Sequence, residues 1–349
     1  MAYKYDALVF IGRFQPLHFG HTAVINEALK IAEEVIMIGG ASFAARSTRT
    51  PFTFEERKRM IRSVYPGFEA DHSLSRVKIV PVPDYPYDEN KWVASIQTAV
   101  MGAIKFHPGP LNIGLIGHQK DHTSYYLKLF PMWGNEGVAN YLGLNATDVR
   151  DELLAEYGYR ENFAALPGTV NDIVRDITER TNAAEFAVLR QEQAMVNAYK
   201  KSWEAAPFPP TFVTTDTVVI QSGHILLVKR GAAPGKGLWA LPGGFLNQNE
   251  TLLDGALREL KEETKIKVPL PVLRGSIKGQ HTFDYPRRSA RGRTITTAFY
   301  IDLGFDTKLP KVTGADDAEK AFWVSFRELD RAKFFEDHFH IINHFLNIG

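Results

Sequence analysis

Three glutamates between residues 244 and 266 are spaced so that one helix would present them together. Glu259, Glu262 and Glu263 fall at i, i+3 and i+4 of the predicted helix and therefore share a face. At about 4 Å and an effective dielectric near 20, two carboxylates repel by roughly 4 kcal/mol. A hard divalent cation is the natural counter-ion, with Mg²⁺ preferred and Mn²⁺ also possible. The alternative is a solvated acidic face.

The segment resembles the Nudix box, in which a glycine and a glutamate precede Arg-Glu and a final Glu-Glu pair. Gly244, Glu250 and Arg258 stand at the matching positions. The resemblance implies a sheet sandwiched by helices that hydrolyses a nucleoside diphosphate linked to another group. We expect Glu250 to steady the loop or Arg258 rather than to bind metal. Lys265 replaces the glycine of the box at the helix end, where a left-handed backbone is expected. A lysine in that conformation is expected to cost about 1 kcal/mol of stability relative to glycine.

The same resemblance assigns roles to the acidic residues. It implies that Glu259, Glu262 and Glu263 hold a metal ion that polarises a diphosphate and activates water, with Glu262 and Glu263 catalytic. Glu319 is a further candidate, either as a metal ligand or as the general base.

Several arginines are candidates for binding the phosphates of this second substrate. The phosphate-binding candidates are Arg258, Arg287, Arg291 and Arg293, with Arg288 beside them. A solvated hairpin tip at 283–299 is an equally good interpretation. The stretch resembles the ADP-ribose-hydrolysing branch of the Nudix family, which implies that ADP-ribose yields AMP and ribose 5-phosphate. Trp239 is expected in the core rather than against adenine.

A second group of residues that could bind a ligand or act in catalysis lies near the other end of the chain. Residues 5–11 predict a buried strand, and residues 22–34 have helical apolar spacing. His18 and His21 flank Gly20 at the start of that helix, where backbone N–H groups and the helix dipole attract anions. With a guanidinium from Arg13, this segment predicts a phosphate site. The alternative is a pair of unrelated loop histidines.

The segment GRFQPLHFGH at 12–21 resembles the H-x-G-H signature of nucleotidyltransferases, and more closely the archaeal-type nicotinamide mononucleotide (NMN) adenylyltransferases. The resemblance implies that Gly12, Phe14 and Gly20 contact ATP or NMN. It also implies that Thr147 and Arg150 hold the β- and γ-phosphates of ATP.

Three further segments resemble parts of that family. The implied nucleotide-binding residues are Arg49, Asp84, Asn90, Trp92, His118 and Asp121. Trp92 would stack on the nicotinamide ring, although core packing is the alternative. Arg49 and its neighbour Arg46 could instead be surface charges, and His118 and Asp121 could belong to a solvated turn.

The implied first reaction is in-line attack by the 5′-phosphate of NMN on the α-phosphorus of ATP, which gives NAD and pyrophosphate. No covalent intermediate is needed. Catalysis would rest on positioning and charge stabilisation by Arg13, His18, His21, Arg150 and Mg²⁺.

Composition limits the remaining classes of function. With 349 residues, the chain is long enough for about two domains. It has no cysteine, which excludes disulfides and thiolate chemistry. It has 41 basic and 40 acidic residues, so we expect small anionic substrates rather than nucleic acid or a membrane surface. The absence of a signal sequence and of a spanning apolar run predicts a cytoplasmic protein.

The expected organisation is two different α/β catalytic domains. We predict a doubly wound, parallel-sheet nucleotidyltransferase domain (Rossmann-like) over 1–185 and a helical, proline-rich linker over 186–210. An α/β/α Nudix sandwich is expected over 211–349, with paired strands at 211–220 and 224–230. Neither the P-loop nor the G-x-G-x-x-G motif is present.

Taken whole, the chain resembles the bifunctional NMN adenylyltransferase/Nudix hydrolases. Two alternatives stay open. Either half could act on other substrates, such as nicotinate mononucleotide or another dinucleotide. The Nudix half could also be a non-hydrolytic sensor of ADP-ribose. The sequence leaves the oligomeric state undecided.

Overall fold

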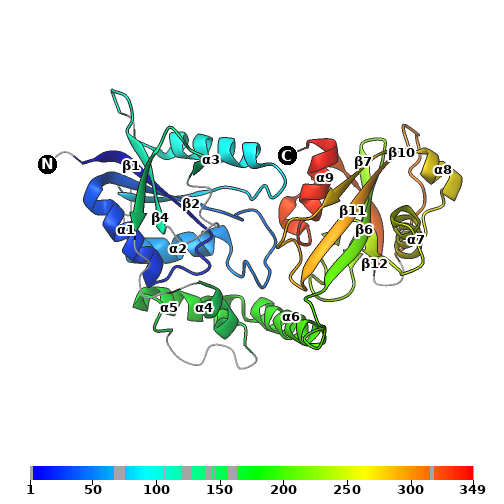
Figure 1. Ribbon diagram of the computed structural model, residues 1–349, viewed down its shortest axis with the longest axis horizontal. Coiled ribbons are helices and arrows are strands. Elements are labelled where there is room, and N and C mark those ends of the chain that lie inside the picture. Colours follow the sequence, from blue (N-terminus) through cyan, green and yellow to red (C-terminus); the bar gives the residue numbers. More distant parts are fainter. Residues whose placement is uncertain are drawn as a thin grey trace. The chain divides into compact units, whose positions relative to one another are not determined.

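The computed structural model describes residues 3–66, 75–105, 107–118, 128–138, 144, 146–155, 163–314 and 318–348. The chain forms two compact units, Met1–Gln191 and Glu192–Gly349. Each unit has its own sheet (Figure 1). Each also has its own hydrophobic core.

The first unit is built on a parallel sheet. Its strands are β1 (Tyr5–Gly12), β2 (Ala32–Gly39), β3 (Val77–Pro81), β4 (Ile113–His118) and β5 (Gly134–Val138). Their spatial order is β3-β2-β1-β4-β5, and every neighbouring pair is parallel. The order reverses between β1 and β4, and ligands of doubly wound sheets bind beyond the carboxyl ends of the strands at such a point. The predicted Rossmann-like fold is confirmed.

Helices cover both faces of this sheet. They are α1 (Phe19–Ile31), α2 (Phe54–Val64), α3 (Glu89–Ala103), α4 (Ala146–Leu153), α5 (Gly168–Asp176), a π-helical turn (Ile177–Thr181) and α6 (Ala183–Lys201). The last helix, α6, continues past the division between the units.

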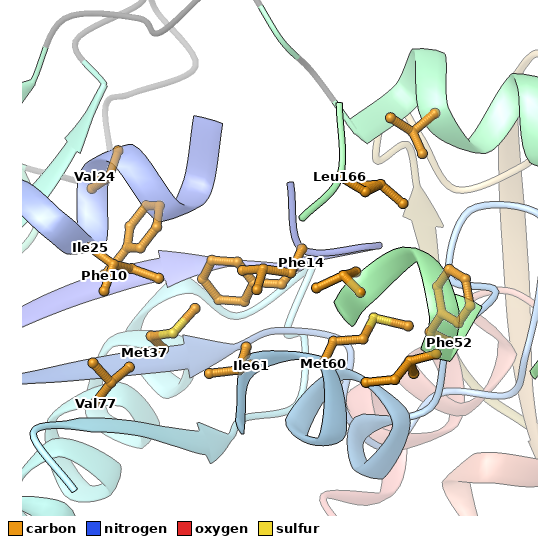
Figure 2. Close-up of a cluster of buried hydrophobic side chains, with 14 of the residues drawn as sticks. Phe10, Phe14, Val24, Ile25, Met37, Phe52, Met60, Ile61, Val77 and Leu166 are labelled. Carbon is orange, nitrogen blue, oxygen red and sulfur yellow. The ribbon is translucent and has the colours of Figure 1, made fainter. Parts of the chain in front are cut away.

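Side chains of β1 alternate between two cores, as a strand buried on both faces requires. Leu8 and Phe10 belong to the core that contains α1, α2 and α5 residues, whereas Ala7 and Val9 belong to the core under α3. Figure 2 shows the first of these cores, where side chains from β1, α1 and α2 point toward one another.

The predicted helix over 22–34 is too long at its end. The helix ends at Ile31, and β2 begins at Ala32, which pairs with Tyr5 of β1. The Ala-Glu-Glu sequence favours helix, but parallel pairing and burial override that propensity. Glu34 is buried there and pairs with Lys78 at 2.7 Å.

The second unit is built on a mixed sheet. Its strands are β6 (Thr211–Gln221), β7 (His224–Arg230), β8 (Trp239–Ala240), β9 (Gly243–Phe245), β10 (Ile277–Phe283), β11 (Arg293–Asp302) and β12 (Ala318–Ser325). The main order is β10-β11-β6-β7-β12, with β8 beside β7 and β9 beside β6. The predicted pairing of the strands at 211–220 and 224–230 is confirmed, because β6 and β7 are antiparallel neighbours.

Helices lie on both faces of the second sheet, in the expected sandwich. The helices are α7 (Leu252–Thr264), α8 (Leu270–Gly275) and α9 (His338–Leu346), with short 3₁₀ turns at Phe326–Glu328 and Arg331–Lys333. Figure 1 shows α7 and α9 on opposite faces. Leu257 and Leu260 of α7 pack on Val219 and Leu226 of the sheet, which turns the acidic face of α7 away from that core.

Candidate active sites

The two histidines of the first unit lie together at the start of α1. His18 is the N-cap residue, and its Nδ1 accepts a hydrogen bond from the backbone N–H of Gly20 at 3.1 Å. Nδ1 of His21 accepts from the backbone N–H of His18 at 3.3 Å, so the two imidazoles form a reciprocal cap. Their rings stack with centroids 3.7 Å apart. Because each Nδ1 is an acceptor, each neutral ring carries its proton on Nε2, which is then a donor.

Glycines make this close packing possible. A Cβ on Gly20 would lie 2.9 Å from Cε1 of His18, and one on Gly12 would lie 2.9 Å from the ring of Phe14. Phe14 is buried in a left-handed conformation, with φ of 50°, and its ring meets that of His21 edge-on at 5.0 Å. Strained conformations of this kind gather at functional sites.

Arg13 and Asp84 come together at the carboxyl ends of the strands. The Arg13 guanidinium donates to Oδ2 of Asp84 at 2.8 Å, and Oδ1 of Asp84 accepts from the backbone N–H of Ala41 at 3.0 Å. The backbone N–H of Gly40 donates to the carbonyl of Gly12 at 3.0 Å. The loops after β1, β2 and β3 therefore meet at one place.

Arg150 reaches the same region from α4. Its guanidinium donates to the carbonyl of Gln15 at 3.1 Å and to the hydroxyl of Thr147 at 3.0 Å. Gln15 lies in the loop between β1 and α1, so Arg150 is held beside the histidine motif although it is 129 positions beyond His21.

Other candidates in the first unit are less clearly placed. Trp92 lies on α3, half-buried against the core on that face, with its ring 6.1 Å from that of Phe130. This packing favours the core interpretation of Trp92. Asn90 is exposed in the first turn of α3. His118 ends β4, but its side chain lies outside the described residues, as does the whole of Asp121.

The two arginines of the loop after β2 differ. Arg46 makes a bidentate ion pair with Glu56, at 2.8 and 3.0 Å, and a further pair with Glu185 at 2.7 Å. These partners indicate a structural role for Arg46. Arg49 is half-buried in the same loop.

In the second unit, Arg258 lies at the centre of the acidic face of α7. It donates to Glu259 at 2.9 Å, to Glu262 at 2.8 Å and to both carboxylate oxygens of Glu250. Arg258 lowers the pKa of Glu250 to about 2. Glu250 thus holds Arg258, as expected, and the backbone N–H of Asn247 anchors it to the loop at 2.8 Å.

Glu263 has a different environment from its neighbours on α7. Burial, with a smaller contribution from the charges of Glu259 and Asp216, raises its pKa to about 8, although the N–H of Gly243 donates to it at 3.0 Å and opposes the shift. Burial is also the main cause of the raised pKa of Glu259. A Cβ on Gly244 would lie 2.5 Å from Oε1 of Glu259, so a larger residue there would displace that carboxylate.

The donor set suits a hard divalent cation. Glu259, Glu262 and Glu263 offer only carboxylate oxygens, and burial of two of them favours a compensating positive charge. Among the described residues, no three acidic or histidine side chains are already gathered around one cation position. The side chain of Glu319, on β12, lies outside the described residues.

The arginines of the segment after β10 do not form one cluster. Arg288 is buried and makes a bidentate ion pair with Asp337, with both distances 2.9 Å. Arg291 lies over the ring of Phe245 at 5.2 Å, and Arg293 donates to the carbonyl of Asp284. Arg287 is exposed. The packing assigns Arg288 to structure, and Trp239 packs edge-on against Phe322 and Phe334 as a core residue would.

The sequence interpretation missed Asp216, which lies in β6 close to Glu263. Asp216 is 4% exposed, and its Oδ2 accepts from the hydroxyl of Thr296 at 2.5 Å. A signal was present, because it is the one acidic residue in the otherwise uncharged strand TFVTTDTVVIQ. Buried carboxylates near a functional site are candidates for a role in it.

Family models match both halves of the chain. A Cytidylyltransferase-like model matches residues 9–89, and a NUDIX domain model matches residues 210–345. Within the part that the structure describes, no helix is both long and apolar enough to cross a membrane.

Two curated relatives each align with a part of the chain. The nicotinamide/nicotinic acid mononucleotide adenylyltransferase of Acinetobacter baylyi is 44% identical over 131 residues, 38% of this chain and 65% of that protein. The chain therefore spans just under two thirds of that relative. The ADP-ribose pyrophosphatase of Methanocaldococcus jannaschii is 33% identical over 135 residues, 38% of this chain and 72% of that protein.

A solved structure also matches the chain along almost its whole length. It is a bifunctional NMN adenylyltransferase/ADP ribose pyrophosphatase from Francisella tularensis, complexed with AMP and a manganese ion. It is 37% identical, covers 99% of this chain and 100% of its own, and has a TM-score of 0.86. The chain belongs to this bifunctional family. Membership confirms the resemblance in both halves and the order of the two folds.

Proposed function

We propose that the chain is a bifunctional enzyme that transfers the adenylyl group of ATP to NMN and hydrolyses ADP-ribose. The observation that carries the first activity is the histidine cap of α1 beside Arg13 and Arg150, at the point where the parallel sheet reverses its order. Family membership supports both activities.

In the proposed first reaction, an oxygen of the NMN 5′-phosphate attacks the α-phosphorus of ATP. The bond from that phosphorus to the bridging oxygen breaks, and pyrophosphate leaves. The Nε2–H groups of His18 and His21, together with the Arg13 and Arg150 guanidinium groups, stabilise negative charge on the phosphoryl oxygens. These residues act by position, since no covalent intermediate forms. The assigned NMN and ATP contacts of Asp84 and Thr147 belong to the same proposal.

In the proposed second reaction, water cleaves the diphosphate of ADP-ribose into AMP and ribose 5-phosphate. Glu259, Glu262 and Glu263 would hold the divalent ion, for which we propose Mg²⁺. When bound, this ion neutralises diphosphate charge and lowers the pKa of a coordinated water. Arg258 holds Glu259 and Glu262 in place, and the N–H of Gly243 orients Glu263.

The test is chromatographic analysis of products from the purified chain. With ATP, NMN and Mg²⁺ we expect NAD and pyrophosphate; with ADP-ribose and Mg²⁺ we expect AMP and ribose 5-phosphate. Comparison of initial rates with nicotinate mononucleotide and with other dinucleotides tests the assigned substrates. Intact ADP-ribose after incubation would reject the second assignment.

A further inference from the structure

A buried arginine lies beneath the proposed adenylyl-transfer site. Arg57, on α2, is 1% exposed. Its guanidinium donates to the carbonyls of Arg13 at 2.7 Å and Gly40 at 2.9 Å, to the carbonyl of Thr53 at 3.3 Å and to the hydroxyl of Ser42 at 3.3 Å. In the described part of the chain, no carboxylate lies within ion-pair distance of it. Burial lowers the pKa of Arg57 to about 10, so it stays charged at neutral pH.

The bonds of Arg57 join the loops that carry the site. Arg13 follows β1, and Gly40 and Ser42 follow β2. Arg13 and Ala41 in turn hold the two carboxylate oxygens of Asp84, from the loop after β3. The guanidinium therefore closes a ring of hydrogen bonds in which the Arg13 backbone, Gly40 and Asp84 hold one another.

The stability of the fold alone does not explain why an arginine is buried at position 57. Burying a charge is costly, and replacing a buried ionic group by a well-packed apolar one is often neutral or stabilising. An apolar residue on the inward face of α2 would fill the same space without that cost. What it would lack is the planar fork that fixes two loop carbonyls at once.

We propose that Arg57 is a positioning residue for adenylyl transfer. It holds the backbone of Arg13 and Gly40, and thereby the Arg13 guanidinium and Asp84, in the arrangement that receives the phosphates. Its buried charge adds positive potential beneath an anion-binding site. This inference rests on the proposed function of the first unit.

The experiment compares four variants of the full chain. Arg57→Met removes all donors, Arg57→Lys keeps the charge without the fork, and Ser42→Ala removes a single acceptor. Arg62→Met, on the exposed face of the same helix, is the matched control. We would measure thermal unfolding, NMN binding by calorimetry, kcat and KM for adenylyl transfer, and the rate of ADP-ribose hydrolysis.

We expect Arg57→Met to lower kcat about 10²-fold, since small misplacements of positioned groups have effects of that size. Arg57→Lys should have a kcat between those of wild type and Arg57→Met, about 10-fold below wild type, because a point charge replaces the planar guanidinium. Arg62→Met should match wild type in every measurement, and ADP-ribose hydrolysis should be unchanged throughout. Ser42→Ala, the mildest change, should lower kcat without lowering the unfolding temperature to the same extent as Arg57→Met.

The proposal is overturned if Arg57→Lys and Ser42→Ala fold and keep wild-type kcat and NMN affinity. It is also overturned if kcat falls only in proportion to the unfolded fraction. Should Arg57→Met fail to fold, those two milder variants decide. Failure of the proposed function looks different, because wild type itself would then neither bind NMN nor form NAD.

Discussion

At the scale of single residues, His18 and His21 serve two purposes with different atoms of one ring. Nδ1 accepts a backbone hydrogen bond at the start of α1, and this bond places the proton on Nε2. The stability of the helix and the protonation pattern of the proposed catalytic groups are therefore set by the same contacts.

We predict that His21→Ala lowers the rate of adenylyl transfer by about 10²- to 10³-fold, as removal of one charge-stabilising donor does elsewhere. ADP-ribose hydrolysis should stay at the wild-type rate, because His21 lies in the other unit. Initial rates of both reactions check this. His107→Ala, an exposed histidine of the same unit, is the control. Equal loss of both activities would refute the two-site proposal.

Glu263→Gln should abolish most ADP-ribose hydrolysis. The amide keeps the size of the side chain but cannot supply a charged oxygen to a divalent ion, so the loss should be about 10²-fold or more. Product chromatography measures it, with exposed Glu204→Gln as the control. Wild-type AMP release from Glu263→Gln would remove Glu263 from the site.

At the scale of elements, the end of α7 has the left-handed conformation that was expected at Lys265. This residue is the C-cap and has left-handed angles, with φ of 48° and ψ of 27°. Glycine is strain-free in that conformation.

Lys265→Gly should therefore raise the free energy of unfolding of the Nudix unit by about 1 kcal/mol. Lys267→Gly, nearby and exposed, should be neutral or slightly destabilising because its φ is not positive. Urea denaturation of the two variants beside wild type gives the comparison. Stabilisation by both substitutions, or by neither, would contradict the strain at Lys265.

The buried pair of Arg288 and Asp337 joins the segment after β10 to the start of α9. Arg288→Met alone should destabilise the Nudix unit by about 3 to 5 kcal/mol, because it leaves Asp337 buried without its partner. The double variant Arg288→Met, Asp337→Leu should recover part of that loss. A single variant with wild-type urea stability would show that Asp337 finds water or another donor.

Periodic patterns predicted most elements, and long-range contacts explain the failures. The strand at β1, the paired β6 and β7, and the acidic helix α7 followed from local sequence. The end of α1 did not, because Ala32 joins β2 through pairing with a strand 27 positions earlier. Arg150 was assigned by resemblance alone, since nothing local places α4 beside Gln15. Asp216 and Arg57 were missed because their roles depend on contacts with residues of other elements.

At the scale of the whole molecule, each unit holds a complete set of proposed catalytic residues. The histidine site draws on residues before Gln191, and the acidic site on residues after Glu192. The same separation explains why two different family models match the two halves.

We therefore expect ADP-ribose to leave the initial rate of adenylyl transfer unchanged, and NMN to leave the rate of ADP-ribose hydrolysis unchanged. Each rate is measured once without the other substrate and once with the other substrate at a saturating concentration. The Glu263→Gln variant prevents hydrolysis of ADP-ribose during the adenylyl-transfer assay, and the His21→Ala variant prevents use of NMN during the hydrolysis assay. A shift in adenylyl transfer without turnover of ADP-ribose would instead favour the sensor alternative.

The histidine cap of α1 has a consequence for attempts to re-engineer this chain. A designer normally protects one set of residues for activity and another set for folding. In this helix cap, His18 and His21 belong to both sets. A library sorted only by resistance to heat or protease, with no substrate present, would still select side chains that cap α1 at positions 18 and 21. Imidazoles found at these positions in such a library would consequently say nothing about whether catalysis had been preserved.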